Sequence, residues 1–255
     1  MSHQPKNPKY GWRPDRLDLR DRILNLGTGP LDVPAKVDLR PNCSEVENQY
    51  QIGSCTANSV AGAVEYLDKK AGSDLVEDLS RLFVYYNTRV IENTVEYDQG
   101  ATLRNTIKSL ATTGACREDM WPYYPENFKV RPNVACYDYA KNHTITEYHR
   151  ILAINDMLRC LADGYPFVFG FQVYSEFEGP IVAKTGILNM PAPTEICRGG
   201  HAVLAVGYDM DKGTMLVRNS WGKQWGQDGY FTMPFAYISN PNMAADMWTI
   251  KKHLD

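Results

Sequence analysis

The hydrophobic periodicity of this chain changes at about residue 165, and the change limits the folds that the chain can adopt. Before that point, apolar residues recur mostly at the spacing of amphipathic helices. After it, short runs rich in β-branched and aromatic residues are typical of strands. Helices followed by strands indicate an α+β fold with two subdomains. We therefore expect a helical half at about 45–160 and a β-rich half at about 165–255.

Capping and stop residues set the expected bounds of the main elements. Four helices are expected: from Cys55 to near Gly72, from Ser80 through Tyr86, from Thr102 through Thr113, and from Asn155 up to Gly164. Four strands are expected at 167–173, 201–208, 214–218 and 230–233, with 209–213 as a hairpin connection.

Length and composition describe an ordinary globular protein. The 255 residues can bury a sizeable core in one large domain or in two halves that share a cleft. The net charge of −3 gives no reason to expect nucleic acid or membrane partners, and no apolar run is long enough to span a bilayer. The polar residues 1–8 do not form a secretory signal peptide, so a cytoplasmic location is expected. Export by another route, or a signal trimmed from the sequence, stays open.

Cys55 stands at the start of the first expected helix, after Gly53 and Ser54. The free N–H groups and the dipole of a helix N-terminus favour negative charge, and therefore the nucleophilic thiolate. A structural thiol is the alternative, because free cysteine is often buried as a small hydrophobe. His201 and Asn219 follow Cys55 by 146 and 164 residues, a spacing typical of papain-type enzymes.

Three short motifs carry a resemblance to the papain family of cysteine peptidases. They are Gln49 with Gly53-Ser54-Cys55, then Gly200-His201-Ala202-Val203, then Asn219-Ser220-Trp221-Gly222. The resemblance runs from about Val33 to Asp255 and is strongest to bacterial members with a short N-terminal region. It implies a papain-like fold, with a helical left subdomain, a β-rich right subdomain and the active site in the cleft between them.

The resemblance implies a cysteine endopeptidase that acts on protein or peptide substrates without a cofactor or metal. Cys55 would be the nucleophile, His201 the proton carrier, Asn219 the residue that orients the imidazole, and Gln49 a donor to the oxyanion. Thr56 and Tyr50 depart from the family pattern, which has an aromatic residue and a glycine at these positions.

The resemblance also implies a set of substrate-binding positions. Gly100, after Gln99, would bond the substrate backbone, and Gly170 and Ala202 would form one wall of the S2 pocket with Thr102 opposite. Asp246 would lie near the pocket floor, where a carboxylate also admits Arg or Lys at P2; a solvated surface aspartate is the alternative. Gly200 and Trp221 complete the set, Trp221 as a cover over the contact between His201 and Asn219.

The N-terminal extension, residues 1–32, is too short for the helical pro-region of secreted relatives. It carries six Lys or Arg against three Asp or Glu in its first 30 residues. It is expected to be either a short pro-segment or latch that inhibits the enzyme, anchored by apolar residues, or an extension docked without regulatory effect. The anchors would be Trp12, Leu17, Leu19, Ile23 and Leu24.

The number and positions of the cysteines indicate whether the protein works in a reducing or an oxidising compartment. With Cys55 free, five remain (Cys43, Cys116, Cys136, Cys160 and Cys197), so at least one more is unpaired. The resemblance implies that two bridging positions of secreted relatives are Ile52 and Asn87 here, which favours a reducing compartment. A Cys116–Cys136 bridge stays open.

Two other functions remain possible for the same residues. One is a different acyl-transfer enzyme, such as a transglutaminase-like enzyme or a deamidase. The other is a catalytically silent binding protein of the same fold.

Overall fold

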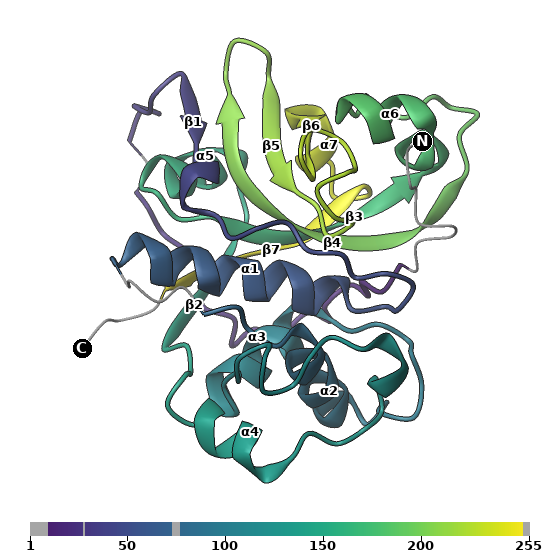
Figure 1. The fold of residues 1–255 in the computed structure, drawn as a ribbon. Helices are drawn as coiled ribbons and strands as arrows, with labels where there is room; N and C mark the ends of the chain where they lie inside the picture. The colour runs from purple at the N-terminus through teal and green to yellow at the C-terminus, as the bar shows by residue number, and fades with distance from the viewer. Residues whose placement is uncertain (1–9, 28, 73–76, 252–255) are drawn as a thin grey trace.

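The computed structural model describes residues 10–27, 29–72 and 77–251. These residues form a helical half and a sheet half, with one long helix between them (Figure 1). The α-helices are α1 (Cys55–Lys70), α2 (Arg81–Glu92), α3 (Leu103–Thr112), α4 (Val134–Ala140), α5 (Ile154–Ala162), α6 (Pro180–Thr185) and α7 (Phe235–Ile238). The strands are β1 (Lys36–Asp38), β2 (Glu147–Ile151), β3 (Phe167–Tyr174), β4 (Cys197–Asp209), β5 (Thr214–Arg218), β6 (Tyr230–Pro234) and β7 (Ala244–Lys251).

All strand pairs of the sheet are antiparallel. The order is β2-β7-β3-β4-β5-β6, and β1 pairs with β4 beside that path. This strand order joins strands that lie far apart in the chain into one sheet. Strand β2 belongs to the sheet because it pairs with β7. The chain contributes β1 to the sheet ahead of the helical half and returns to it at Glu147, earlier than the expected change at about 165.

Helix α1 is buried along almost its whole length, because α2 and α3 pack on one side of it and the sheet packs on the other. Small residues of its sequence, such as Ala57, Ala61 and Ala63, allow this close approach and are at most 2% exposed. A helix packed on both sides fixes the position of its first residue. Cys55 is thus held where the two halves meet.

Side-chain caps start α2 and α3 where the sequence predicts them. The Ser80 hydroxyl accepts the N–H of Phe83 at 3.1 Å, and the Thr102 hydroxyl accepts that of Asn105 at 3.3 Å. Helix α2 continues past the expected end to Glu92, where Asn93 adopts a left-handed conformation. The prediction that Asn155 caps a helix is wrong, because α5 begins at Ile154 after Ala153, which makes no side-chain cap bond.

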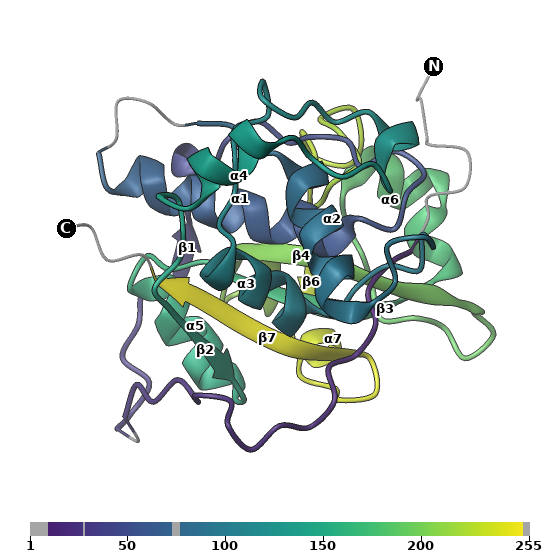
Figure 2. The same cartoon turned by 90° about the horizontal axis from the view of Figure 1, so that it is seen from below.

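The N-terminal segment, defined here as residues 10–27, crosses the molecule as an extended chain. Figure 2 shows it (purple) passing along the side of β7 and β2 before it turns toward β1. Trp12 and Leu24 are buried, as expected of anchors. Leu17 and Leu19 are 91% and 93% exposed and Ile23 is 46% exposed, so the prediction that these three anchor the segment is wrong. Polar contacts hold that part of the segment instead.

All six cysteines are free thiols. Cys116 and Cys136 lie in one small buried cluster with Phe83 and Ala140, and they are not bonded to each other. The structure therefore does not contain the Cys116–Cys136 bridge that the sequence leaves open.

Candidate active site

Cys55 begins α1, and side-chain contacts fix the turn in front of it. The Asn58 amide donates to the backbone oxygen and to the hydroxyl of Ser54, both at 3.0 Å. The Ser54 hydroxyl also bonds the Tyr123 hydroxyl at 2.5 Å, and Tyr123 donates to the Gln49 carbonyl at 2.9 Å. These contacts hold the turn rigidly, so the thiol is presented at the N-terminus of the helix.

His201 and Asn219 meet in the sheet half. His201 lies on β4 and Asn219 follows β5 directly, and the imidazole Nε2 lies 2.8 Å from the Asn219 Oδ1. The Nδ1 atom is buried and has no hydrogen-bond partner among the described residues. The Trp221 ring covers the imidazole at a centroid distance of 5.2 Å, and Phe171 supports it from β3 at 5.9 Å. The ring is thus oriented, with one nitrogen left for another partner.

Gln49 lies on the chain six residues before Cys55 and is hydrogen-bonded to Ser220, the residue after Asn219. The Ser220 hydroxyl donates to the Gln49 Oε1 at 2.6 Å, and the Gln49 N–H donates to the Ser220 carbonyl at 2.8 Å. With its oxygen held in this way, the side chain presents its NH₂ group, which donates to the Ile52 carbonyl at 3.1 Å. The two halves of the molecule are therefore joined at the site itself.

The N-terminal segment covers this site. Gly11 passes so close to the turn before Cys55 that a Cβ on it would lie 2.0 Å from the Gly53 oxygen. The Tyr10 ring packs edge-on against His201 at 6.0 Å, and its hydroxyl donates to Glu178 at 2.7 Å. Cys55 and His201 are both 0% exposed as a result of this enclosure.

Enclosure shifts both titrating groups toward their neutral forms. Burial raises the pKa of the Cys55 thiol to about 11, although the N–H groups of Ala202 and Gly11 oppose the shift. Burial lowers the pKa of His201 to about 4, and the hydrogen bond to Asn219 opposes that shift. At neutral pH the covered site therefore holds a thiol and a neutral imidazole.

The segment also bonds the backbone of the helical half. Ala101 donates its N–H to the Gly11 carbonyl at 2.7 Å, and its own carbonyl accepts the Arg13 N–H at 3.0 Å. The sequence predicts that Gly100 bonds the backbone of a substrate, and in this structure the Gly100 N–H is directed to the Tyr85 hydroxyl at 3.2 Å. The N-terminal segment is therefore bonded through Ala101, the residue after Gly100.

A carboxylate fastens the turn before Cys55 to the same loop. Asp98 Oδ1 accepts the Gly53 N–H at 2.9 Å and the Tyr85 hydroxyl at 2.5 Å. Tyr85 in turn holds Gly100. This Asp98 clamp links the nucleophile's turn with the loop that bonds the N-terminal segment, and sequence reasoning missed it.

The Trp12 ring fills the space between Gly170, Gly200 and Asp246, which is called the Trp12 pocket. The ring lies against Gly170 and Gly200, where an added Cβ would come within 1.9 and 2.6 Å of ring carbons. The indole N–H donates to Asp246 Oδ2 at 3.2 Å. Asp246 is buried, at 5% exposure, so it is not the solvated surface aspartate that the sequence left as an alternative.

The other expected pocket residues lie nearby but differ in their contacts. Ala202 pairs with Gly170 across β3 and β4. The Thr102 hydroxyl donates to Glu92 at 2.9 Å and caps α3, so its polar group serves the helix. Gln99 is exposed. The residues that sequence reasoning missed are Tyr10 and Gly11, whose only sequence signal is an aromatic residue and a glycine ahead of Trp12.

Comparison with known proteins identifies the family. A family model described as papain family cysteine protease matches residues 33–247. The chain belongs to the papain family of cysteine proteases. This papain-family protease is 41% identical over 247 residues to an uncharacterised peptidase C1-like protein, L477, of Acanthamoeba polyphaga mimivirus, which covers 93% of this chain and 78% of that protein. It is 31% identical over 218 residues to cathepsin B-like CP2 of Giardia intestinalis, covering 79% and 69%.

Solved structures agree with the fold. Xylellain, a cysteine protease from Xylella fastidiosa, superposes on this papain-family protease with a TM-score of 0.91 and 40% identity, covering 98% of each chain. Bromelain from Ananas comosus, solved in complex with the E64 inhibitor, superposes with a TM-score of 0.67 at 23% identity, covering 87% of this chain and 100% of that one. At that identity the likeness shows the fold alone. No helix within the described residues is both long and apolar enough to cross a membrane.

Proposed function

We propose that this papain-family protease is an endopeptidase in which Cys55, His201, Asn219 and Gln49 carry the reaction. The observation that supports this most directly is the imidazole of His201. It is held by Asn219 at 2.8 Å, and its Nδ1 is left without a partner. The N–H of Ala202, the residue after His201 on β4, also lowers the pKa of the Cys55 thiol, which supports a position of the thiol near this ring.

The proposed reaction needs the site uncovered. In the uncovered and solvated site, the imidazole of His201 takes the proton of the Cys55 thiol. The thiolate then attacks the carbonyl carbon of the substrate and forms a tetrahedral oxyanion. Collapse of this intermediate breaks the C–N bond, and the imidazolium gives its proton to the leaving amine. A water molecule then hydrolyses the thioester with the imidazole as base. An amide suffices to hold the ring, because the thiolate itself stabilises the imidazolium.

Gln49 is proposed to stabilise the oxyanion together with the Cys55 N–H. The Ser220 hydroxyl fixes the amide oxygen of Gln49 at 2.6 Å, so the NH₂ group is presented in one orientation. A preorganised donor of this kind stabilises charge without reorganisation at the moment of reaction.

The N-terminal segment is proposed to inhibit the enzyme. It encloses Cys55 and His201 and fills the pocket that a substrate side chain would need, which favours the latch over an extension without effect. Gly11→Val tests this in the full chain, because a side chain there would collide with the Gly53 oxygen. Activity on a peptide should rise at least tenfold. The control is Gly29→Ala, since a Cβ at Gly29 would meet nothing within 4 Å. Unchanged activity of Gly11→Val would count against inhibition.

The pocket that Trp12 fills is proposed to bind a bulky P2 side chain. Trp12 shows that a large aromatic ring fits and that its N–H reaches Asp246. Asp246 also faces Arg150, whose Nη1 lies 3.1 Å from Oδ1, so its charge is already balanced. We therefore expect Trp or Tyr at P2 to be favoured over Arg or Lys. A P2 peptide library in which Arg or Lys gave the fastest cleavage would contradict this.

Labelling with the epoxide inhibitor E-64 tests the proposed activity. In the Gly11→Val chain, mass spectrometry should find one adduct at Cys55, and the Cys55→Ala variant should carry none. A peptide with glutamine and an added amine should give hydrolysed fragments. Amine-linked or deamidated product instead would indicate a transglutaminase-like enzyme or a deamidase, and absence of any adduct would indicate a silent binding protein.

A further inference from the structure

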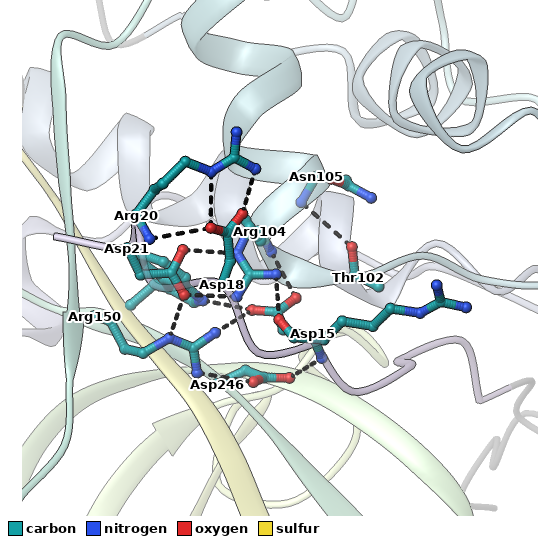
Figure 3. A network of polar contacts seen from close by, with 11 residues as sticks. Asp15, Asp18, Arg20, Asp21, Thr102, Arg104, Asn105, Arg150 and Asp246 are labelled. Carbon is teal, nitrogen blue, oxygen red and sulfur yellow. Dashed lines mark hydrogen bonds and ion pairs between the residues drawn. The ribbon is translucent and has the colours of Figure 1, made fainter. Parts of the chain in front are cut away.

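Two arginines of the body bind the carboxylates of the N-terminal segment in a dense polar network (Figure 3). Arg104 lies on α3 and Arg150 on β2, and their side chains are only 8% and 17% exposed. The carboxylates that they bind belong to Asp15 and Asp21 of the segment.

Arg104 makes polar contacts with the segment through both its backbone and its side chain. The guanidinium grips Asp21 with Nε at 2.8 Å and Nη2 at 2.6 Å, a bidentate arrangement. Its Nη1 donates to the Arg16 carbonyl at 2.7 Å, and its backbone N–H donates to Asp15 Oδ1 at 3.1 Å. The guanidinium and the backbone N–H of Arg104 therefore both donate to the N-terminal segment.

Arg150 joins the two carboxylates of the segment to the Trp12 pocket. Its Nη2 donates to Asp15 at 2.8 Å and its Nε to Asp21 at 3.0 Å, whereas its Nη1 donates to Asp246 of the body. The Trp248 indole N–H also donates to Asp15, at 2.9 Å, and its ring lies 4.5 Å below the Arg150 guanidinium. The Asp15 side chain is completely buried by these donors.

If the segment left, this site would carry an excess of positive charge and hydrogen-bond donors without acceptors. Arg104, Arg150 and Asp246 carry a net charge of +1, and the donors that held Asp15 and Asp21 would lose their acceptors. A preorganised cluster of guanidinium and indole donors, partly desolvated, is a receptor for a carboxylate. It adjoins the pocket directly, because Asp246 accepts both the Trp12 indole N–H and the Asp15 backbone N–H.

We propose that Arg104, Arg150 and the Trp248 N–H form a carboxylate subsite, which binds an acidic side chain of the peptide substrate next to the Trp12 pocket. The proposal rests on the proposed function, because it assigns the class of peptide that the same cleft takes. In the covered enzyme, Asp15 and Asp21 occupy this subsite, so the segment and an acidic substrate compete for it.

The segment also indicates where the acidic residue must stand. Asp15 follows Trp12 by three residues, a distance of up to about 10 Å along an extended chain. The intervening Arg13 pairs with Glu92 of α2, whose other carboxylate oxygen accepts the Thr102 and Asn105 groups. An acidic residue directly next to the pocket residue would face Glu92 and be disfavoured. One that lies two or three positions beyond the pocket residue, away from the cleaved bond, would be favoured.

Binding to the full chain with an inactivated nucleophile tests the subsite. The protein carries Cys55→Ala, Gly11→Val, Asp15→Asn and Asp21→Asn, so that the segment no longer occupies the arginines. The peptides keep Trp at P2 and carry Glu or Gln at P3, P4 or P5, and isothermal titration calorimetry at low salt gives each dissociation constant. Glu at P4 or P5 should bind about tenfold more tightly than Gln, and Glu at P3 more weakly than Gln.

Substitutions then assign the effect to the two arginines. Arg104→Gln and Arg150→Gln should each bring the Glu-to-Gln ratio close to one, whereas Lys108→Gln on the same helix should leave it unchanged. Because the ratio compares two peptides on one protein, a loss of folded protein does not mimic the result, and Arg150→Lys, which keeps the charge, should retain part of it. Equal affinities for Glu and Gln at P4 and P5 would overturn the proposal.

A parallel assay with Cys55 intact separates this inference from the proposed function. Tight binding of the acidic peptide without cleavage would contradict the proposed peptidase activity and support the carboxylate subsite. Cleavage of the Glu and Gln peptides at equal rates would contradict the carboxylate subsite and support the proposed peptidase activity.

Discussion

At the scale of single residues, the structural positions of the proposed catalytic groups were predictable, because each stands in a short motif with its own structural reason. Cys55 starts a helix, His201 lies in a buried strand and Asn219 directly follows the next strand. Asp98 and Ala101 were not predictable, because their roles depend on where two loops meet rather than on local sequence.

Gln49→Ala should slow the uncovered enzyme strongly. Removal of one oxyanion donor costs about 3 kcal/mol of barrier, so kcat should fall by a factor on the order of 10² to 10³ with little change in KM. Steady-state kinetics in the Gly11→Val background measure this. Gln51→Ala, an exposed neighbour on the same turn, is the control and should keep its kcat. A loss of less than threefold for Gln49→Ala would argue that Gln49 does not face the oxyanion.

The alkylation of Cys55 should depend on pH differently in the covered and uncovered enzyme. In the covered site, the raised pKa of Cys55, about 11, and the lowered pKa of His201, about 4, keep both groups neutral between these values. In Gly11→Val, solvent returns, the thiol pKa falls and the imidazole pKa rises, so a thiolate–imidazolium pair forms.

Iodoacetamide rates measured from pH 5 to 10 check this expectation. The uncovered variant should react at least tenfold faster than the wild type at pH 6–7. The ratio should shrink toward pH 10, where ordinary thiols ionise as well. Parallel pH profiles for the two proteins would contradict the expected shifts.

At the scale of elements, the helices and strands with clear periodicity were predicted well, and those with mixed polarity were missed. Strand β2 alternates weakly, with four half-buried residues before Ile151, and β7 is interrupted by Asp246 in a left-handed conformation. Their place in the sheet comes from pairing with each other and with β3, which no local pattern encodes.

The Asp98 clamp joins two loops between elements, and its loss should impair catalysis more than stability. Asp98→Ala removes the acceptor for the Gly53 N–H and the Tyr85 hydroxyl, so the turn before Cys55 and the loop at Gly100 become free to separate. In the Gly11→Val background we expect kcat/KM to fall on the order of tenfold.

Asp98→Asn keeps an acceptor oxygen and should restore most of that loss, which a purely charge-based role would not allow. Tyr85→Phe, which removes the bonds of the hydroxyl to Asp98 and to Gly100 but keeps the bond between Asp98 and the Gly53 N–H, should raise KM with little change in kcat. Equal activity of Asp98→Ala and the parent would show that the clamp is dispensable.

At the scale of the whole molecule, buried charge joins the two halves behind the active site. Arg218 of β5 donates to the carbonyls of Ser44 and Glu45 at 2.7 and 2.6 Å, and its guanidinium packs against Gly62 of α1. Burial raises the pKa of Glu65, and the guanidinium of Arg218 opposes the shift. Composition and periodicity predicted two halves, but not that a buried arginine of the sheet is hydrogen-bonded to the chain ahead of α1.

Arg218→Leu should therefore destabilise the whole fold. It leaves the Ser44 and Glu45 carbonyls without their donor and removes the positive charge that favours ionised Glu65, at a cost of about 3 kcal/mol in the free energy of unfolding. Urea denaturation followed by circular dichroism measures the change. Arg198→Leu, an exposed arginine paired with Glu178, should cost less than about 1 kcal/mol. A similar decrease in the free energy of unfolding for both substitutions would show that Arg218 stabilises the fold no more than an exposed arginine does.

The N-terminal segment is continuous with β1, which is paired to β4 in the body. Its high local concentration therefore does not change when the protein is diluted, and the proposed inhibition would be equally complete in a concentrated and in a dilute solution. One cut in the stretch between Leu24 and Lys36 would turn the same residues into a separate peptide, held by its own affinity alone. After such a cut, dilution would be enough to release the enzyme, and the change could not be reversed by concentrating the protein once the peptide had been degraded.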